Sequence, residues 1–329
     1  MESLKKNIKE GLDRILKKLE EKKNEKKFET VAEGWLKSKK NSVKLSTYYN
    51  YSYSVEKYLY PEFAGKDITK IRDCNDFIDD LLDTLAPKTV RDIISKLNSI
   101  FKYYEDEKNV KLKIKKMSLP KLVKRKIQIL SKKEKDKLEK YCLEENNLKT
   151  LGILICLNTG IRIGELCALK WKNINLEENY IFIEKTMQRI RNLNSNSPKT
   201  IIIEESPKSS TSHRKIPIPE NLLPLFNKFK TNDECYLLTG QSDKFIEPRL
   251  LERKFSKYIK AAGISKANFH MLRHTFATMC IEEGFEIKCL SEILGHSGSQ
   301  ITLDRYVHSS FTLKKNWINK FSNQNISCH

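Results

Sequence analysis

The sequence lacks the features that mark membrane, secreted and nucleotide-binding proteins. It has no apolar run long enough to cross a bilayer and no signal peptide, so we expect no membrane partner. It has no GxxxxGK[ST] loop to cradle a nucleotide, and it gives no sign of a cofactor. Its eight cysteines form no CxxC pair, and several lie in apolar helical contexts, as Cys156 and Cys280 do. We therefore interpret them as small buried side chains in a reducing cytoplasm.

The chain is strongly cationic. Its 329 residues include 62 Lys and Arg against 42 Asp and Glu, which gives a formal net charge of +20 and a pI near 9.4. This balance favours a polyanionic partner, with nucleic acid as the leading interpretation. An anionic membrane or the ribosome would explain the charge as well, because net charge alone does not distinguish polyanions.

Composition and apolar periodicity divide the chain into four segments and predict a mainly α fold with a small antiparallel β-sheet (α+β). Residues 1–27 are densely charged with a short amphipathic helical stripe, and residues 28–110 have the spacing of a small all-helical domain. Residues 111–127 form a basic, proline-containing linker. Residues 128–329 form a second, mixed helical domain that ends in a helix-forming tail.

The first domain is expected to hold four helical regions. The second is capped by Ser46 or Thr47 and ended by Pro61, and the third is interrupted within residues 68–85. Pro87 opens a long fourth helix with a continuous apolar stripe.

In the second domain, Ser131 caps a helix, and the next helix, at residues 148–158, is apolar nearly all round. Alternating or apolar β-rich stretches then suggest one small sheet, and two further helices follow. The β-rich stretches lie at residues 180–185, 200–204 and 214–218, and the helices at 221–230 and 248–262.

Several basic and aromatic side chains are candidates for contact with a nucleic-acid backbone. They occur in the first domain, in the linker and on the helix at residues 248–262, where a solvated basic face is the competing interpretation. The candidates are Lys44, Tyr48, Lys121, Lys124, Arg125, Arg249, Arg253 and Lys257.

The stretch from residue 269 to residue 308 organises the chain, because it holds four of the six histidines. The string HMLRH opens a helix on which His270 and Arg273 share a face, a pair suited to gripping an oxyanion. A second helix ends at a glycine just before His296, and a third presents Tyr306. A tyrosine hydroxyl near these donors could act as a nucleophile rather than as packing.

Each of these residues also has an ordinary structural interpretation. His270 and His274 have the spacing of a helical zinc site, but the acid of HExxH is missing, so the pattern does not favour zinc. We interpret His274 as structural, and a lone tyrosine such as Tyr306 is usually packing.

Taken together, the strings resemble the tyrosine recombinase (phage integrase) family. HMLRHTFAT, then LGHS, then a tyrosine ten positions later resemble its C-terminal signature. TGIRIGELCALKW at residues 159–171 resembles its first arginine box, and SPKSSTSHRKIPIP at residues 206–219 its lysine-bearing hairpin. The resemblance implies a catalytic set, supported by the acid Glu165, of Arg162, Lys208, His270, Arg273, His296 and Tyr306.

The resemblance implies a site-specific recombinase that cleaves and rejoins DNA through a 3′-phosphotyrosyl intermediate, without metal or cofactor. The two arginines and His296 would bind the scissile phosphate, and Tyr306 would attack it. His270 would take the tyrosine proton and Lys208 would protonate the leaving oxygen. A type IB topoisomerase-like enzyme and a non-catalytic DNA-binding protein of the same fold are the alternatives.

The resemblance also implies partners. Two duplex DNA sites would be held by a homo-tetramer whose C-terminal helices exchange between protomers, with accessory DNA-bending or directionality proteins as further candidate partners. By layout, residues 28–110 resemble the family's SAM-like core-binding domain. The target DNA sequence, and the choice between integration and excision of a mobile element, do not follow from the sequence.

Overall fold

The computed structural model of the protein describes residues 21, 23–122, 127–192, 198, 200–206, 213–306 and 318–319, and for Arg305 the backbone alone. The chain forms two compact units. Unit 1 comprises Met1–Arg125 with Ile190–Lys199, and unit 2 comprises Lys126–Arg189 with Thr200–His329.

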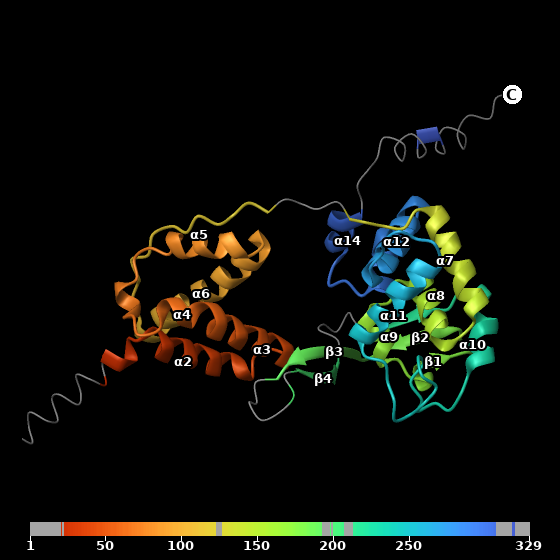
Figure 1. The fold of residues 1–329 in the computed structure, drawn as a ribbon, viewed down its shortest axis with the longest axis horizontal. Helices are drawn as coiled ribbons and strands as arrows, with labels where there is room; N and C mark the ends of the chain where they lie inside the picture. The colour runs from red at the N-terminus through yellow and green to blue at the C-terminus, as the bar shows by residue number, and fades with distance from the viewer. Residues whose placement is uncertain are drawn as a thin grey trace, which may run out of the picture. The chain divides into compact units, whose positions relative to one another are not determined.

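The described part of unit 1 is built from helices around a single apolar core (Figure 1). The stripe predicted for the long helix is confirmed, since Val90, Ile94 and Leu97 are fully buried. Pro87 stands at its first turn, where the missing N–H has no partner to lose. The elements are α2 (Phe28–Lys40), α3 (Leu45–Ser54), the π-helical turn η1 (Val55–Leu59), α4 (Tyr60–Phe63), the 3₁₀ turn η2 (Ile68–Lys70), α5 (Asn75–Thr84) and α6 (Pro87–Lys108).

The second helical region of unit 1 differs from its prediction at both ends. The capping position is Lys44, not Ser46 or Thr47, and its side chain makes no capping hydrogen bond. Pro61 does not end the helical path but stands in the first turn of α4. The π-helical turn before it explains the difference, because the amide of Tyr60 bonds five residues back to Val55 and the register shifts ahead of the proline.

The predicted linker has no helix or strand in its described part, but it is bonded to unit 1 over much of its length. The amide of Lys115 donates to the carbonyl of Arg72 at 2.8 Å, and the Arg91 guanidinium donates to the carbonyl of Pro120 at 3.0 Å. Lys121 is exposed. Two further candidates for DNA contact, Lys124 and Arg125, lie outside the described residues.

Unit 2 surrounds α8 (Leu148–Thr159), which is buried on nearly every side as its sequence predicts. Helix α12 (Phe269–Glu282) packs directly on it. Ser131 caps the first helix of the unit in a reciprocal capping box with Glu134, as predicted. The remaining helices are α7 (Lys132–Glu145), α9 (Ile163–Ala168), η3 (Trp171–Asn173), η5 (Glu220–Leu222), α10 (Leu223–Phe229), α11 (Pro248–Ala261), α13 (Ile287–Leu294) and α14 (Ser299–Tyr306).

The strands of unit 2 form two small sheets rather than the one expected. Strands β1 (Ile174–Asn175), β2 (Tyr180–Ile183) and β5 (Arg214–Pro217) form an antiparallel sheet in that order. Strand β4 (Thr200–Glu205) pairs instead with β3 (Thr186–Arg191), which the sequence analysis missed. Polar Gln188 and Arg189 interrupt the apolar character of β3, so its composition gave little strand signal.

Both ends of the chain fall largely outside the described residues. In the predicted N-terminal amphipathic helix, residues 21 and 23–25 are described and helical. The predicted C-terminal docking helix is described at residues 318 and 319 alone. Within the described ranges, no helix has the length and apolar character needed to span a membrane.

Gly164 allows β3 to approach the start of α9. A Cβ at this position would lie 2.6 Å from the carbonyl oxygen of Met187 and 2.7 Å from the Thr186 hydroxyl. We expect Gly164→Ala to lower the free energy of unfolding by about 1–3 kcal/mol, because backbone must move. Gly298→Ala, with nothing within 4 Å of its added Cβ, is the control and should change stability by under about 0.5 kcal/mol. Chemical denaturation measures both, and equal effects would contradict the close approach.

Candidate active site

Three arginines converge on the C-terminal end of α13. Arg214 donates to the carbonyl of Ile293 at 2.6 Å, Arg273 to that of Leu294 at 2.8 Å, and Arg162 to that of Gly295 at 2.9 Å. The last carbonyls of a helix have no partner within it, and they carry the negative end of its dipole. The end of α13 therefore supplies three consecutive acceptors that hold cations in place.

Glu165 links two of these arginines. Its carboxylate accepts from the Arg162 guanidinium at 2.7 Å and from Arg214 at 2.8 and 3.2 Å, and its side chain is only 2% exposed. Burial raises the pKa of this carboxyl, but hydrogen bonds and charge from Arg214 and Arg162 outweigh it and hold the pKa below its ordinary value. Glu165 is therefore ionised at neutral pH, which fits the supporting role expected of it.

Arg214 was not among the predicted site residues. It begins β5, where alternate residues face inward, so Arg214 and Ile216 are buried while Lys215 is exposed. This alternation along the strand is the sequence signal that could have identified Arg214 as a buried residue. Gly295 is adapted to the arginine, because a Cβ there would lie 2.9 Å from its guanidinium and the residue has a φ of +62°.

Arg273 and His296 form a second part of the site. The Arg273 guanidinium also donates to the carbonyl of Gly160 at 2.7 Å and lies 2.9 Å from Nε2 of His296. Since a guanidinium only donates, Nε2 accepts, and the ring proton is on Nδ1. Nδ1 then donates to the hydroxyl of Thr302 at 2.8 Å. Thr302 is fully buried and was also missed, although it lies one helical turn before Tyr306.

Tyr306 lies beside this pair. Its ring is nearly parallel to that of His296, with an interplanar angle of 7° and 6.3 Å between centroids. Its hydroxyl is 2.9 Å from Nδ1 of His274, and the residue is 6% exposed. His270 is exposed, with its ring 4.5 Å from that of His274.

Of the six predicted catalytic residues, the structure thus gathers four around the end of α13 and places a fifth, His270, on the adjoining helix. Lys208, the sixth, lies outside the described residues.

The gathered groups carry a surplus of positive charge. Three guanidinium groups, from Arg162, Arg214 and Arg273, face one carboxylate, a difference of two charges. Burial and the neighbouring Arg162 lower the pKa of Arg273 to about 9, so it is still cationic at neutral pH. Such a site suits an anion with more than one negative oxygen, such as a phosphodiester under attack.

The chain matches a known protein family over more than half of its length. The model of the family described as "Phage integrase family" matches residues 122–312. The chain belongs to this family. The model of the phage integrase N-terminal SAM-like domain matches residues 27–98. Members of the family are DNA strand-transferring enzymes, so the predicted family and enzyme class are confirmed.

Curated relatives of this phage integrase family member carry recombinase and integrase names. A "Tyrosine recombinase XerC-like" protein of Caldanaerobacter subterraneus subsp. tengcongensis is 29% identical over 247 residues, 68% of this chain and 63% of the relative. The aligned part thus spans just under two thirds of that relative. The ICEBs1 integrase of Bacillus subtilis is 25% identical over 300 residues, 85% of this chain and 78% of the relative.

Solved structures share the fold. A Tn1549 transposon integrase in complex with a circular intermediate DNA matches with a TM-score of 0.69 at 19% identity, over 88% of this chain and 99% of that one. A lambda integrase dimer bound to a COC' core site matches with a TM-score of 0.59 at 18% identity, over 85% of this chain and 96% of that one. The predicted fold class, helical with small sheets, is confirmed.

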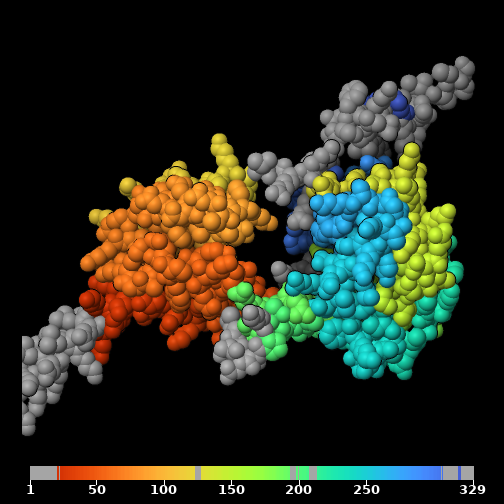
Figure 2. Space-filling view, in the orientation of Figure 1, coloured from red at the N-terminus to blue at the C-terminus, as the bar shows by residue number. Residues whose placement is uncertain are grey.

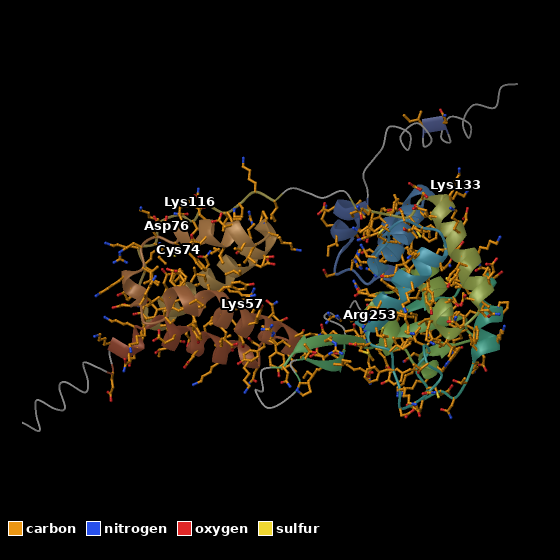
Figure 3. The ribbon with its side chains drawn as sticks, viewed as in Figure 1. Lys57, Cys74, Asp76, Lys116, Lys133 and Arg253 are labelled. Carbon is orange, nitrogen blue, oxygen red and sulfur yellow. The ribbon has the colours of Figure 1, made fainter. Side chains whose placement is uncertain are left out.

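Helix α11 has one apolar and one cationic face. Arg249, Arg253 and Lys257 are exposed, and each lies two residues, about 200° around the helix, from a buried side chain. The buried series is Leu251, Phe255 and Ile259. In Figure 2, the part of the surface whose colour corresponds to residues near 250 faces the viewer. Figure 3 labels Arg253 of α11. In unit 1, Lys44 and Tyr48 are both half-buried.

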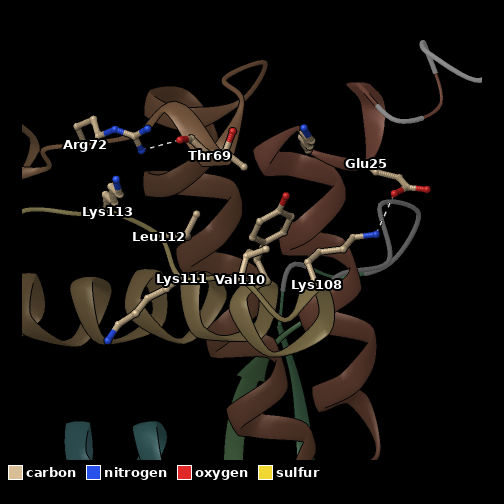
Figure 4. Close-up of a pocket in the computed structure, with 10 residues that line it drawn as sticks. Glu25, Thr69, Arg72, Lys108, Val110, Lys111, Leu112 and Lys113 are labelled. Atoms are coloured by element: carbon tan, nitrogen blue, oxygen red, sulfur yellow. Dashed lines mark hydrogen bonds and ion pairs between the residues drawn. The ribbon is translucent and has the colours of Figure 1, made fainter.

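Unit 1 has a cationic pocket of its own, of about 560 Å³ (Figure 4). Lys108 donates to Glu25 at 2.8 Å and Arg72 to the carbonyl of Thr69 at 2.6 Å. None of the predicted catalytic residues lines it. The lining residues are Glu25, Lys26, Thr69, Arg72, Tyr104, Lys108 and residues 110–113.

Replacing Glu165 by Gln should destabilise unit 2, because Arg214 would remain buried without a carboxylate. We expect a loss of about 3–5 kcal/mol in the free energy of unfolding at pH 7. The lowered pKa means that the contribution of Glu165 is complete above the ordinary value of 4.5 and is lost as the pH falls through the folded value. The wild type and variant should therefore converge in acid.

Glu234→Gln is the matched control for this measurement. Glu234 is exposed and pairs with Lys170 and Lys172, so its loss should cost under about 1 kcal/mol. A Glu165→Gln loss as small as the control's would contradict the role of Glu165 in holding the arginines.

Proposed function

We propose that the chain is a site-specific DNA recombinase that integrates or excises a mobile element in the cytoplasm. The observation that carries the proposal is the placement of Tyr306 beside a buried cluster with surplus positive charge, formed by arginines and His296. A relative named as an integrase and a fold neighbour solved with transposon circular intermediate DNA support it.

In the proposed reaction, the guanidinium groups of Arg162 and Arg273 bind the non-bridging oxygens of the scissile phosphate. Arg273 is held by the carbonyls of Gly160 and Leu294. Arg162 is held by the carbonyl of Gly295 and by the carboxylate of Glu165, which it shares with Arg214, so positive charge remains for the phosphate. When the phosphate takes the place of His296 as the partner of Arg273, His296 is freed to contact it too. His270 remains in the proposed set, on the exposed side of α12.

The strand transfer conserves bond energy. The Tyr306 oxygen attacks phosphorus, its bond to phosphorus forms, and the bond from phosphorus to the 5′ oxygen breaks. The tyrosine proton leaves, and the 5′ oxygen takes a proton, for which Lys208 is the proposed donor. A 5′-hydroxyl of another strand then attacks the phosphotyrosine and reverses these steps, which joins two different strands without a nucleotide.

Recombination of two duplexes needs a protomer for each exchanged strand. We therefore propose a homo-tetramer on two sites, with the C-terminal segments exchanged between protomers, and accessory DNA-bending or directionality proteins as further partners. The domain limits proposed for binding DNA are residues 28–110 and 128–329, joined by the linker at 111–127.

The nucleophile can be tested with one substitution. Wild type and Tyr306→Phe are incubated with nicked suicide duplexes taken from the DNA that flanks the gene, and SDS-resistant protein–DNA bands are measured. We expect an adduct with the wild type and none with Tyr306→Phe, because a phenyl ring has no oxygen to attack phosphorus. Similar affinity of both proteins for the duplex is the control. An adduct formed by Tyr306→Phe would refute the assignment, and a plasmid that is only relaxed would favour a topoisomerase.

The cationic face of α11 can be tested through salt dependence. We expect the triple replacement of Arg249, Arg253 and Lys257 by Gln to lower the slope of log affinity against log salt by up to about 3, roughly 0.9 per lost phosphate contact. The matched control replaces three exposed lysines of α7, including Lys133, which is labelled in Figure 3. Its members are Lys133, Lys137 and Lys140. Equal changes in slope for both triples would contradict a specific role for α11.

A further inference from the structure

The hydroxyl of Tyr306 is paired with a histidine that the sequence analysis assigned to packing. Nδ1 of His274 lies 2.9 Å from it, a normal hydrogen-bond distance, and the two rings are 5.5 Å apart. The two residues come from different helices, α12 and α14, which pack on one another. The contact is thus part of the packing that places the nucleophile.

We propose that His274 takes the proton of Tyr306 as the tyrosine attacks the DNA phosphate. This inference rests on the proposed function and adds a catalytic residue to it, since Nδ1 touches the reacting oxygen. Attack by a phenol on phosphorus releases the phenolic proton, so it needs a base at hydrogen-bond distance.

The proton balance of the step is simple. In the neutral His274 ring the proton is on Nε2, and Nδ1 accepts the hydrogen bond from Tyr306. As the bond from the tyrosine oxygen to phosphorus forms, the phenolic proton moves to Nδ1 and the ring becomes a cation. When a 5′-hydroxyl later attacks the phosphotyrosine, the same proton returns to the leaving tyrosine oxygen. One group thus serves as base in cleavage and as acid in joining.

The other histidines of the site are engaged elsewhere. His296 uses both ring nitrogens, Nε2 toward Arg273 and Nδ1 toward Thr302. It also presents its ring face to Tyr306, with the rings nearly parallel. The rings of His270 and His274 meet in a T-shaped, edge-to-face contact, at an interplanar angle of 85°. The histidine at hydrogen-bond distance from the tyrosine hydroxyl is His274.

The surroundings of His274 allow a transient positive charge. Helix α8, which packs against α12, is mostly apolar and buried, and Lys288 and Glu292 of α13 are exposed. The Arg273 guanidinium is held by the carbonyls of Gly160 and Leu294. The charges balance over the step, because the phosphodiester keeps one negative charge and Lys208, the proposed donor, becomes neutral as it protonates the 5′ oxygen. The titratable groups in contact with the His274 ring are His270 on α12 and Tyr306 on α14. Arg273 precedes His274 on α12 and contacts His296, whose ring faces Tyr306.

The test compares His274→Asn with the wild type. The asparagine amide can still accept a hydrogen bond near the position of Nδ1, but it does not take a proton. Rates of adduct formation on the suicide duplex are measured from pH 5 to 9. The wild type should slow as the pH falls below the ordinary histidine pKa of about 6.5. His274→Asn should be about 10²–10⁴-fold slower at neutral pH and should lose this acid limb.

Three controls separate proton transfer from folding and positioning. DNA affinity and thermal unfolding of His274→Asn should stay near the wild-type values. A substrate with sulfur in place of the bridging 5′ oxygen has a leaving group that needs no proton, so it should rescue Lys208→Ala but not His274→Asn. His270→Asn, one helical turn away, should keep the acid limb whatever its rate.

The outcomes distinguish this inference from the proposed function. No adduct with the wild type would refute the proposed function itself. The role of His274 alone would be overturned if the wild type forms the adduct and His274→Asn forms it at a similar rate that still falls in acid. Loss of the acid limb in His270→Asn, but not in His274→Asn, would assign the proton to His270 instead.

Discussion

The carbonyl end of α13 accepts hydrogen bonds from three arginines that come from three other elements, the start of α9, β5 and α12. Cations that approach one another this closely repel, and burial increases the repulsion. Helix carbonyls can hold them because they are dipoles, which orient a guanidinium without cancelling its charge. The carboxylate of Glu165 is bonded to two of them, Arg162 and Arg214, and cancels part of the charge.

This arrangement leaves a buried cluster with surplus positive charge, which suits the phosphate that we propose binds there. If each arginine had its own carboxylate, the cluster would be neutral and a phosphate would have to displace a salt bridge. Because carbonyls hold the guanidinium groups, these groups are already oriented and still carry positive charge for a phosphate. The glycine at the end of α13 is part of the same design, since Arg214 lies where a side chain at Gly295 would be.

Local sequence signals predicted the elements that carry the site, and long-range contacts decided the rest. Ser131 correctly predicted the start of α7, and the glycine after α13 correctly predicted where that helix ends. Motif spacing led to Arg162, Arg273, His296 and Tyr306 because the residues recur in a known order. Nothing local indicates that Arg214 would meet Glu165, 49 positions away, or that Thr302 would fix the tautomer of His296. Pro61 misled for a similar reason, since no local pattern indicates the π-helical turn that shifts the hydrogen-bond register before it.

The bonds that fix the linker to unit 1 also limit how far the two units can separate. The last of these bonds reaches Pro120, and the amide of Leu130 is already bonded to Thr275 in unit 2. Ten Cα–Cα steps between these anchors reach at most roughly 35 Å when fully extended. If both units bind one duplex, as proposed, so short a connection places the second unit at a high effective concentration once the first is bound.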